Sequence, residues 1–229
     1  MSVVNASNLS RRFGRRWAYA RIDMRLEAGE KVLLIGANGS GKTTLLRTFS
    51  TLLSPSLGNL ELFGQSVTAG RNLDAVRRRI GMLSHQTGLY EDLSILDNLK
   101  VFAKLFGRPT DEISLNTHIE AVGLDGRSEP IRTYSAGMRK RASVALLRLK
   151  DPELILLDEP FSALDPTGID EVATLLQALP ATQILVSHQV ERAAQLCDRC
   201  ILLESGLIRW QGPANKAWDA WRKAQQDAS

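Results

Sequence analysis

The fold of this chain is decided by nine consecutive residues, Gly36-Ala37-Asn38-Gly39-Ser40-Gly41-Lys42-Thr43-Thr44. They match the phosphate-binding loop pattern G-x-x-x-x-G-K-[ST] at every fixed position. Residues 31–35 before the loop predict a buried strand, and residues 45–49 after it predict the start of a helix. The glycines let the loop wrap a phosphate chain with its N–H groups pointing inward, and the helix dipole adds positive potential there. We therefore expect Lys42 to reach the β- and γ-phosphates of a nucleotide and Thr43 to bind Mg²⁺.

The composition of the chain is that of a soluble globular protein. Of its 229 residues 44% are hydrophobic and 24% are charged, and the formal net charge is +4. Basic residues form short clusters such as Arg77-Arg78-Arg79, which we interpret as solvated faces in preference to a surface for lipid headgroups or nucleic acid. No secretion signal and no run of about 18 apolar residues is visible. The sequence thus predicts a cytoplasmic protein that works at a membrane only through another chain.

The two cysteines, Cys197 and Cys200, form a C-x-x-C pair. A zinc site would need two further ligands, and the sequence has no second pair of cysteines. Cys200 also begins the apolar run of residues 200–203, which predicts a strand. We therefore expect two buried, reduced thiols that pack as small hydrophobic side chains.

Strands and helices alternate along most of the chain, which predicts a mostly parallel sheet covered on both faces. Between about Gly88 and Leu149 the apolar residues recur at helical spacing, so we expect a helical insert there. After Pro213 we expect a last helix whose apolar stripe packs on the protein's own core. This stripe consists of Ala217, Trp218, Trp221 and Ala224.

Two carboxylates follow the apolar strand predicted at residues 154–157. We expect Asp158 to hold Mg²⁺ and Glu159 to orient and polarise the attacking water, because a nucleotide hydrolase needs both opposite its phosphate loop. Gln86 follows a strand predicted at 80–83, where an amide can bind the metal or its water. His188 follows a strand predicted at 183–186, where an imidazole can hydrogen-bond a γ-phosphate.

These motifs together resemble the nucleotide-binding subunit of an ATP-binding-cassette (ABC) transporter, and the resemblance covers nearly the whole chain. In family terms the loop is Walker A, Asp158 closes Walker B, and Glu159 is the catalytic glutamate. The resemblance implies that hydrolysis is carried by Glu159, His188 and Gln86, and that Mg²⁺ is bound by Thr43, Gln86 and Asp158. It implies ATP binding by Phe13, which stacks on adenine, by the signature residues Ser135 and Gly137, and by Gly36, Ala37, Asn38, Gly39, Ser40, Gly41, Lys42, Thr43 and Thr44.

The resemblance also implies the architecture and the partners. The fold is then an α/β P-loop NTPase, an ABC-type ATPase core with an antiparallel β subdomain and an inserted α-helical subdomain. Residues 1–229 would form a single nucleotide-binding domain, with 1–87 and 150–229 as the RecA-like core and β subdomain, and 88–149 as the helical subdomain carrying the signature motif. One copy of each motif implies a head-to-tail homodimer with two composite ATP sites. The expected partners are integral membrane transporter subunits, which would hold the chain peripherally at the cytoplasmic face of the cell membrane; no nucleic acid is expected.

The signature segment, Tyr134-Ser135-Ala136-Gly137-Met138, departs from the family pattern LSGGQ. It keeps the serine and the second glycine, so a hydroxyl and an N–H remain for a γ-phosphate. A regulatory binding module without turnover is disfavoured, because Glu159 and His188 are both present.

Within the family, several segments are similar to the ATP-binding subunits of haem exporters that serve cytochrome c maturation. They are residues 80–86, 89–94, 98–99, 135–137 and 158–163. Two alternatives stay open. One is another exporter, for drugs, lipids or polysaccharides. The other is a soluble ABC-type ATPase without a transporter, a class that usually carries long coiled coils, zinc modules or a second cassette, none of which the sequence shows.

Overall fold

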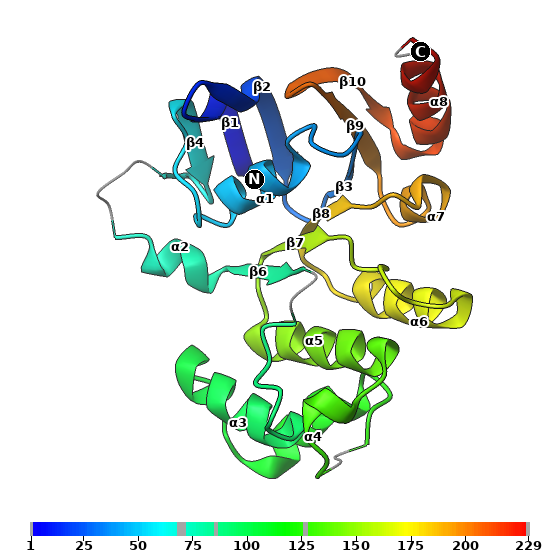
Figure 1. Cartoon of the computed structure of the whole chain (residues 1–229). Helices are drawn as coiled ribbons and strands as arrows, with labels where there is room; N and C mark the ends of the chain where they lie inside the picture. The colour runs from blue at the N-terminus through cyan, green and yellow to red at the C-terminus, as the bar shows by residue number, and fades with distance from the viewer. Residues whose placement is uncertain (1, 68–71, 85–86, 126–127, 228–229) are drawn as a thin grey trace.

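The computed structural model describes residues 2–67, 72–84, 87–125 and 128–227. A six-stranded sheet lies at its centre, with strand order β10-β9-β3-β8-β7-β6 (Figure 1). Strands β9, β3, β8, β7 and β6 run parallel, and β10 is antiparallel to β9. Their bounds are β3 Lys31–Ile35, β6 Ile80–Leu83, β7 Leu154–Asp158, β8 Thr182–Val186, β9 Arg199–Glu204 and β10 Leu207–Pro213. All residues of β7 and β8 are buried, as expected for central strands covered on both faces, and the predicted mostly parallel sheet is confirmed.

A second, four-stranded antiparallel sheet has the order β2-β1-β4-β5. It consists of β1 (Ser2–Phe13), β2 (Arg16–Glu27), β4 (Leu57–Leu62) and β5 (Gln65–Ser66). The helix α1 (Lys42–Phe49) lies between the two sheets, and its buried side chains Leu45, Leu46 and Phe49 share one apolar core with residues of both (Figure 1). The antiparallel β sheet beside the α/β core therefore fixes where the loop before α1 sits.

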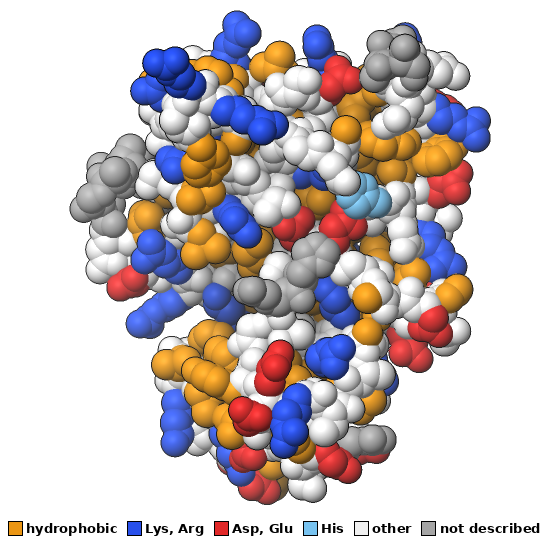
Figure 2. Space-filling view, viewed as in Figure 1, with side chains coloured by type: hydrophobic (Ala, Val, Ile, Leu, Met, Phe, Trp, Pro, Cys, Tyr) orange, Lys and Arg blue, Asp and Glu red, His pale blue; other side chains and the backbone are white. Residues whose placement is uncertain are grey.

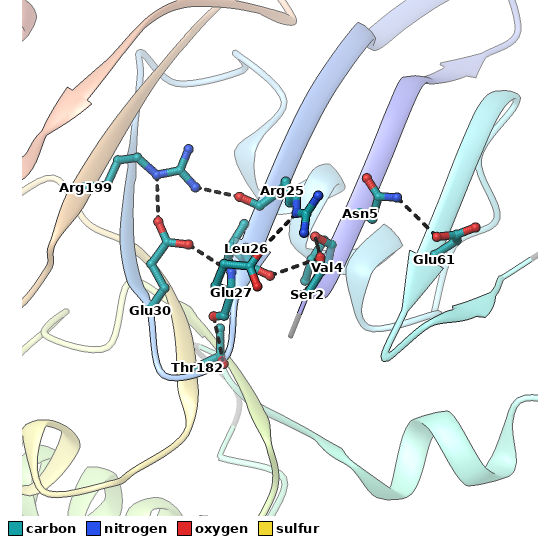
Figure 3. Close-up of polar contacts among 10 residues, drawn as sticks. All are labelled: Ser2, Val4, Asn5, Arg25, Leu26, Glu27, Glu30, Glu61, Thr182 and Arg199. Atoms are coloured by element: carbon teal, nitrogen blue, oxygen red, sulfur yellow. Dashed lines mark hydrogen bonds and ion pairs between the residues drawn. The ribbon is translucent and has the colours of Figure 1, made fainter.

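Polar contacts fasten the two sheets to each other where β2 turns into β3 (Figure 3). The guanidinium of Arg199 donates to Glu30 Oε1 at 2.8 Å and to the backbone oxygen of Arg25 at 2.7 Å. The Thr182 hydroxyl donates to the backbone oxygen of Glu27 at 3.5 Å. Because these residues come from β2, β8, β9 and the turn before β3, the antiparallel sheet is tied to three strands of the parallel one.

Three helices pack together at one end of the molecule, where the sequence predicts the helical insert (Figure 1). They are α3 (Ile95–Phe106), α4 (Glu112–Glu120) and α5 (Ala136–Lys150), and a 3₁₀ turn at Ile131–Thr133 precedes α5. The Ser94 hydroxyl caps α3 by accepting the N–H of Asp97, and Gly107, with φ of +67°, ends it. The left-handed conformation of Gly107 therefore ends α3.

The remaining helices cover the sheet and the C-terminal edge. They are α2 (Asp74–Arg78), α6 (Pro166–Gln177), α7 (Val190–Ala194), α8 (Ala217–Asp227) and the 3₁₀ turn Ala214–Lys216. The helix α6 begins at Pro166, because Asp165 caps it by accepting the N–H of Gly168 and a proline is favoured in the first turn. The stripe on α8 packs on the main core as predicted. Among the described residues, no helix is long and apolar enough to cross a membrane.

Candidate active site

A cavity of about 560 Å³ opens where the β3–α1 loop meets the carboxyl ends of β7 and β8 and the β1–β2 hairpin. Ligands of parallel α/β sheets bind at this edge, because the strands end there and the helices begin. Figure 2 shows the corresponding face, with a histidine beside acidic side chains. The lining residues are Phe13, Arg16, Trp17, Ala18, Asn38, Gly39, Gly41, Lys42, Thr43, Thr44, Asp158, Glu159, Val186 and His188.

The loop curls around the ammonium of Lys42, which is 7% exposed. Lys42 Nζ donates to the backbone oxygens of Gly36 at 2.7 Å and Ala37 at 2.9 Å. Burial lowers the pKa of Lys42, while the charges of Glu159 and Asp158 act in the opposite direction. The Ser40 hydroxyl is buried without a hydrogen-bond partner among the described residues. The loop therefore presents a positive charge to the cavity, where it suits an anionic ligand.

The tight packing of this loop requires a glycine at position 41. Gly41 has φ of +105° and forms the N-cap of α1. A Cβ there would overlap the carbonyl oxygen of Ala18 on β2. The loop is therefore held directly against the antiparallel sheet, and no side chain fits between them.

A carboxylate and a hydroxyl meet at the base of the cavity. Asp158, the last residue of β7, is 4% exposed, and its Oδ1 accepts a hydrogen bond from the Thr43 hydroxyl at 3.2 Å. Thr43 lies in the first turn of α1, next to Lys42. Oxygen ligands of this kind are those that Mg²⁺ prefers, so the donor set fits the ion that the sequence predicts.

Glu159 and His188 form a pair at the ends of β7 and β8. The backbone N–H of His188 donates to Glu159 Oε2 at 3.2 Å, and His188 Nε2 lies 3.4 Å from Glu159 Oε1. Glu159 has φ of +53°, a sparsely populated conformation for a side-chain-bearing residue, and such strain is typical of functional sites. Its Oε1 is buried beside the His188 imidazole and accepts no hydrogen bond among the described residues, so the imidazole is the polar group that faces it.

Aromatic side chains form the outer wall. Phe13, at the end of β1, is 50% exposed, and the Arg11 guanidinium lies 4.8 Å from its ring centre. Arg16 and Trp17, which the sequence reasoning missed, line the same cavity. Their positions three and four residues after Phe13 could have indicated this. A tight hairpin between Phe13 and Arg16 brings the second strand back beside the first.

The predicted signature residues lie elsewhere. Ser135 caps α5, where its hydroxyl accepts the N–H of Met138 at 3.2 Å, and Gly137 is in the first turn of that helix. Neither lines the cavity. Gln86 falls outside the described residues.

Comparison with known proteins identifies the family. The profile described as "ABC transporter" matches residues 19–162. The chain belongs to the ABC transporter family.

Two relatives and one solved structure illustrate the kinship. The cassette is 34% identical over 221 residues to the daunorubicin resistance ATP-binding protein DrrA3 of Streptomyces coeruleorubidus, covering 94% of this chain and 69% of that one. It is 31% identical over 230 residues to the L-cystine transport system ATP-binding protein TcyN of Escherichia coli, a match that covers 93% of this chain and 91% of that one. Its fold is similar to the dimeric ATP-binding cassette MJ0796 bound to ADP and Pi, with a TM-score of 0.82 at 23% identity over 92% and 98% of the two chains.

The expected fold, an ABC-type ATPase, is therefore confirmed. The cassette is an ATPase domain of a family that binds ATP with Mg²⁺. ABC ATP-binding subunits dimerise and associate with membrane transporter subunits. The geometry of this chain agrees with that chemistry, since it places an ammonium, a carboxylate–hydroxyl pair and a carboxylate–imidazole pair in one cavity.

Proposed function

We propose that this chain is the ATP-hydrolysing subunit of a transporter that exports its cargo through separate membrane subunits. One observation carries the hydrolytic part. The Thr43–Asp158 contact and the Glu159–His188 pair line the same cavity as Lys42, at the end of the same strand and loop. Metal binding, phosphate binding and proton acceptance are thus available within one site.

Each residue has a role that follows from its contacts. Lys42 and the loop N–H groups bind the ATP phosphates, and Phe13 stacks on the adenine. Thr43 and Asp158 hold Mg²⁺, with Gln86 as the predicted third ligand; the ion supplies positive charge against the phosphate oxygens. Glu159 accepts the proton of the attacking water, and His188 holds that carboxylate in place and contacts the γ-phosphate.

The position of the signature residues supports a dimer. Because Ser135 and Gly137 lie at the start of α5 and outside the cavity, they are available to a nucleotide held by a second copy. We propose a head-to-tail homodimer with two composite sites, in which residues 88–149 act as the helical subdomain and residues 1–87 and 150–229 as the core. ATP would close this dimer and hydrolysis would release it.

An apolar surface on the helical layer suits contact with a membrane subunit. Tyr90 is 52% and Leu105 is 66% exposed. The Tyr90 ring centre lies 5.8 Å from that of Phe102, which lies 5.8 Å from that of Phe106. Figure 2 shows hydrophobic side chains gathered over this end of the molecule. Exposed apolar rows of this kind mark protein–protein contact, and docking here would place the chain at the cytoplasmic face of the membrane.

For the cargo, we propose haem as the first candidate, on the similarity of residues 80–86, 89–94, 98–99, 135–137 and 158–163 to haem-exporter subunits. A drug is the second candidate, supported by the relative named for daunorubicin resistance. The ATP-binding subunit leaves recognition of the cargo to the membrane subunits, so the partner decides between them.

The test is an affinity pull-down of the Glu159→Gln variant from detergent-solubilised membranes with ATP and Mg²⁺. The matched control is Glu153→Gln, since Glu153 precedes the same strand at the opposite edge of the sheet and pairs with Arg79. We expect the Glu159→Gln variant to recover a polytopic membrane protein when ATP is present. Less of that protein should be recovered when ADP replaces ATP. Recovery of soluble protein or nucleic acid alone would overturn the transport function and leave the ATPase chemistry standing.

A further inference from the structure

Two lysines of α5 hold the helix against the two ends of β6. Lys150 Nζ donates to the backbone oxygen of Arg77 at 3.1 Å and to that of Ile80, at the beginning of the strand. Lys140 Nζ donates to the backbone oxygen of Ser84 at 3.1 Å, just after the strand ends. Both ammonium groups therefore bind main-chain carbonyls, at opposite ends of β6.

Between these two points α5 presses directly on the strand. A Cβ at Gly81 would lie 2.6 Å from Leu147 Cδ2 and 2.9 Å from Pro152 Cγ, so a larger residue in the middle of β6 would force these side chains to shift. One turn after Lys140, the Ser143 hydroxyl donates to the backbone oxygen of Thr87 at 3.4 Å. Since α5 and β6 touch at both ends and in the middle, they are held as one unit.

Only one of the two lysines faces the catalytic carboxylates. Lys140 is 7% exposed; burial lowers its pKa, and the charges of Asp158 and Glu159 act against that effect. For Lys150, burial lowers the pKa with no carboxylate acting against it. The end of β6 lies beside the end of β7, where Leu83 pairs with Leu157, so the Lys140 ammonium is bonded to the chain that follows the neighbour of the catalytic strand.

We infer that Lys140 is a positioning residue for ATP hydrolysis, which holds the signature helix and the end of β6 in register with Asp158 and Glu159. This inference rests on the proposed function. Lys140 follows Ser135 by five residues on the same helix, so a fixed Lys140 fixes the signature residues as well. Its ammonium also offsets part of the negative charge of Asp158 and Glu159, which must stand beside phosphates. It touches no reacting atom and acts through the groups it holds.

The experiment compares Lys140→Met, Lys140→Arg and Lys150→Met with the wild-type chain. Steady-state hydrolysis gives kcat and KM, equilibrium binding gives the ATP affinity, and calorimetry gives Tm. We expect Lys140→Met to lower kcat about tenfold while KM and ATP affinity change by less than about twofold, the signature of a loss restricted to the chemical step. Lys140→Arg keeps the charge and the donor and should restore most of kcat.

Lys150→Met is the matched control, because it removes the same groups from the same helix away from the carboxylates. We expect it to lower Tm and to leave kcat within about twofold of wild type. The inference is overturned if Lys140→Met keeps the wild-type kcat, if both methionine variants lose kcat in proportion to Tm, or if Lys140→Arg is as slow as Lys140→Met. A wild-type chain that binds ATP without hydrolysing it would instead overturn the proposed function, and the inference with it.

Discussion

The substitution Gly41→Ala tests how the phosphate loop is held. Gly41 combines two constraints that an alanine would violate. Its φ of +105° is unfavourable for any residue with a side chain, and its Cβ position overlaps the Ala18 carbonyl oxygen. That oxygen belongs to the backbone of β2 and cannot rotate away as a flexible side chain would, so the loop or the strand must shift.

The magnitude follows from these two constraints. Placing alanine at positive φ costs about 1–2 kcal/mol, and overpacking against a fixed group adds about 1–3 kcal/mol. Gly39 provides the matched control in the same loop, because it has φ of +79° but no atom lies within 4 Å of its Cβ position. We therefore expect the free energy of unfolding to fall by about 2–5 kcal/mol for Gly41→Ala and by about 1–2 kcal/mol for Gly39→Ala.

The assay is urea unfolding of both variants without nucleotide, so that effects on ATP binding do not enter. The difference between the two free energies isolates the contact with Ala18 from the backbone strain. Equal destabilisation of the two variants would refute the reasoning, since it would mean that the loop does not rest against β2.

Three further predictions follow from the site and the core. Asp158→Asn should abolish Mg²⁺-dependent ATP turnover, measured as phosphate release with and without Mg²⁺; unchanged turnover would remove Asp158 from the metal site. Burial raises the pKa of the Cys197 and Cys200 thiols to about 12. A thiol reagent at pH 8 should therefore label both cysteines slowly in the native protein and rapidly in guanidinium. Rapid labelling of the native protein would contradict this. Burial raises the pKa of Tyr19 from 10.0 to about 12, so its folded form favours the neutral phenol and stability should fall as pH rises from 10 to 12. Tyr19→Phe should lack that component and should lose about 1 kcal/mol at neutral pH through the missing 2.7 Å hydrogen bond to Thr48, as measured by urea unfolding; an identical pH profile would count against it.

Local pattern was enough for the central strands and for the positions of the motif residues. The bounds of β3 and β6 agree with the apolar runs at 31–35 and 80–83, because a strand buried on both faces is a continuous apolar segment. The strand β1 was not predicted. It contains Asn5, Ser7 and Asn8, and its pairing with β2 is interrupted by register shifts that break the alternation.

Long-range contacts account for what the sequence reasoning missed. Lys140 and Ser84 are separated by 56 positions, and nothing near either residue indicates that they meet. The helix α1 already ends at Phe49, two residues before Thr51 with its φ of +63°, whereas the sequence predicts only the start of a helix at residues 45–49 and no end. Periodicity reports which face is buried, but it does not register a backbone turn that depends on the surrounding fold.

The central claim is that Glu159 is the base for ATP hydrolysis in this cassette, and phosphate release by the Glu159→Gln variant tests it most directly. With ATP and Mg²⁺ present, we expect kcat to fall by about 10²–10⁴-fold, while the affinity for ATP, measured by equilibrium binding, stays close to that of the wild-type chain. A variant that binds ATP and releases phosphate at the wild-type rate would contradict the account, because the Glu159 carboxylate beside His188 would then have no part in the reaction.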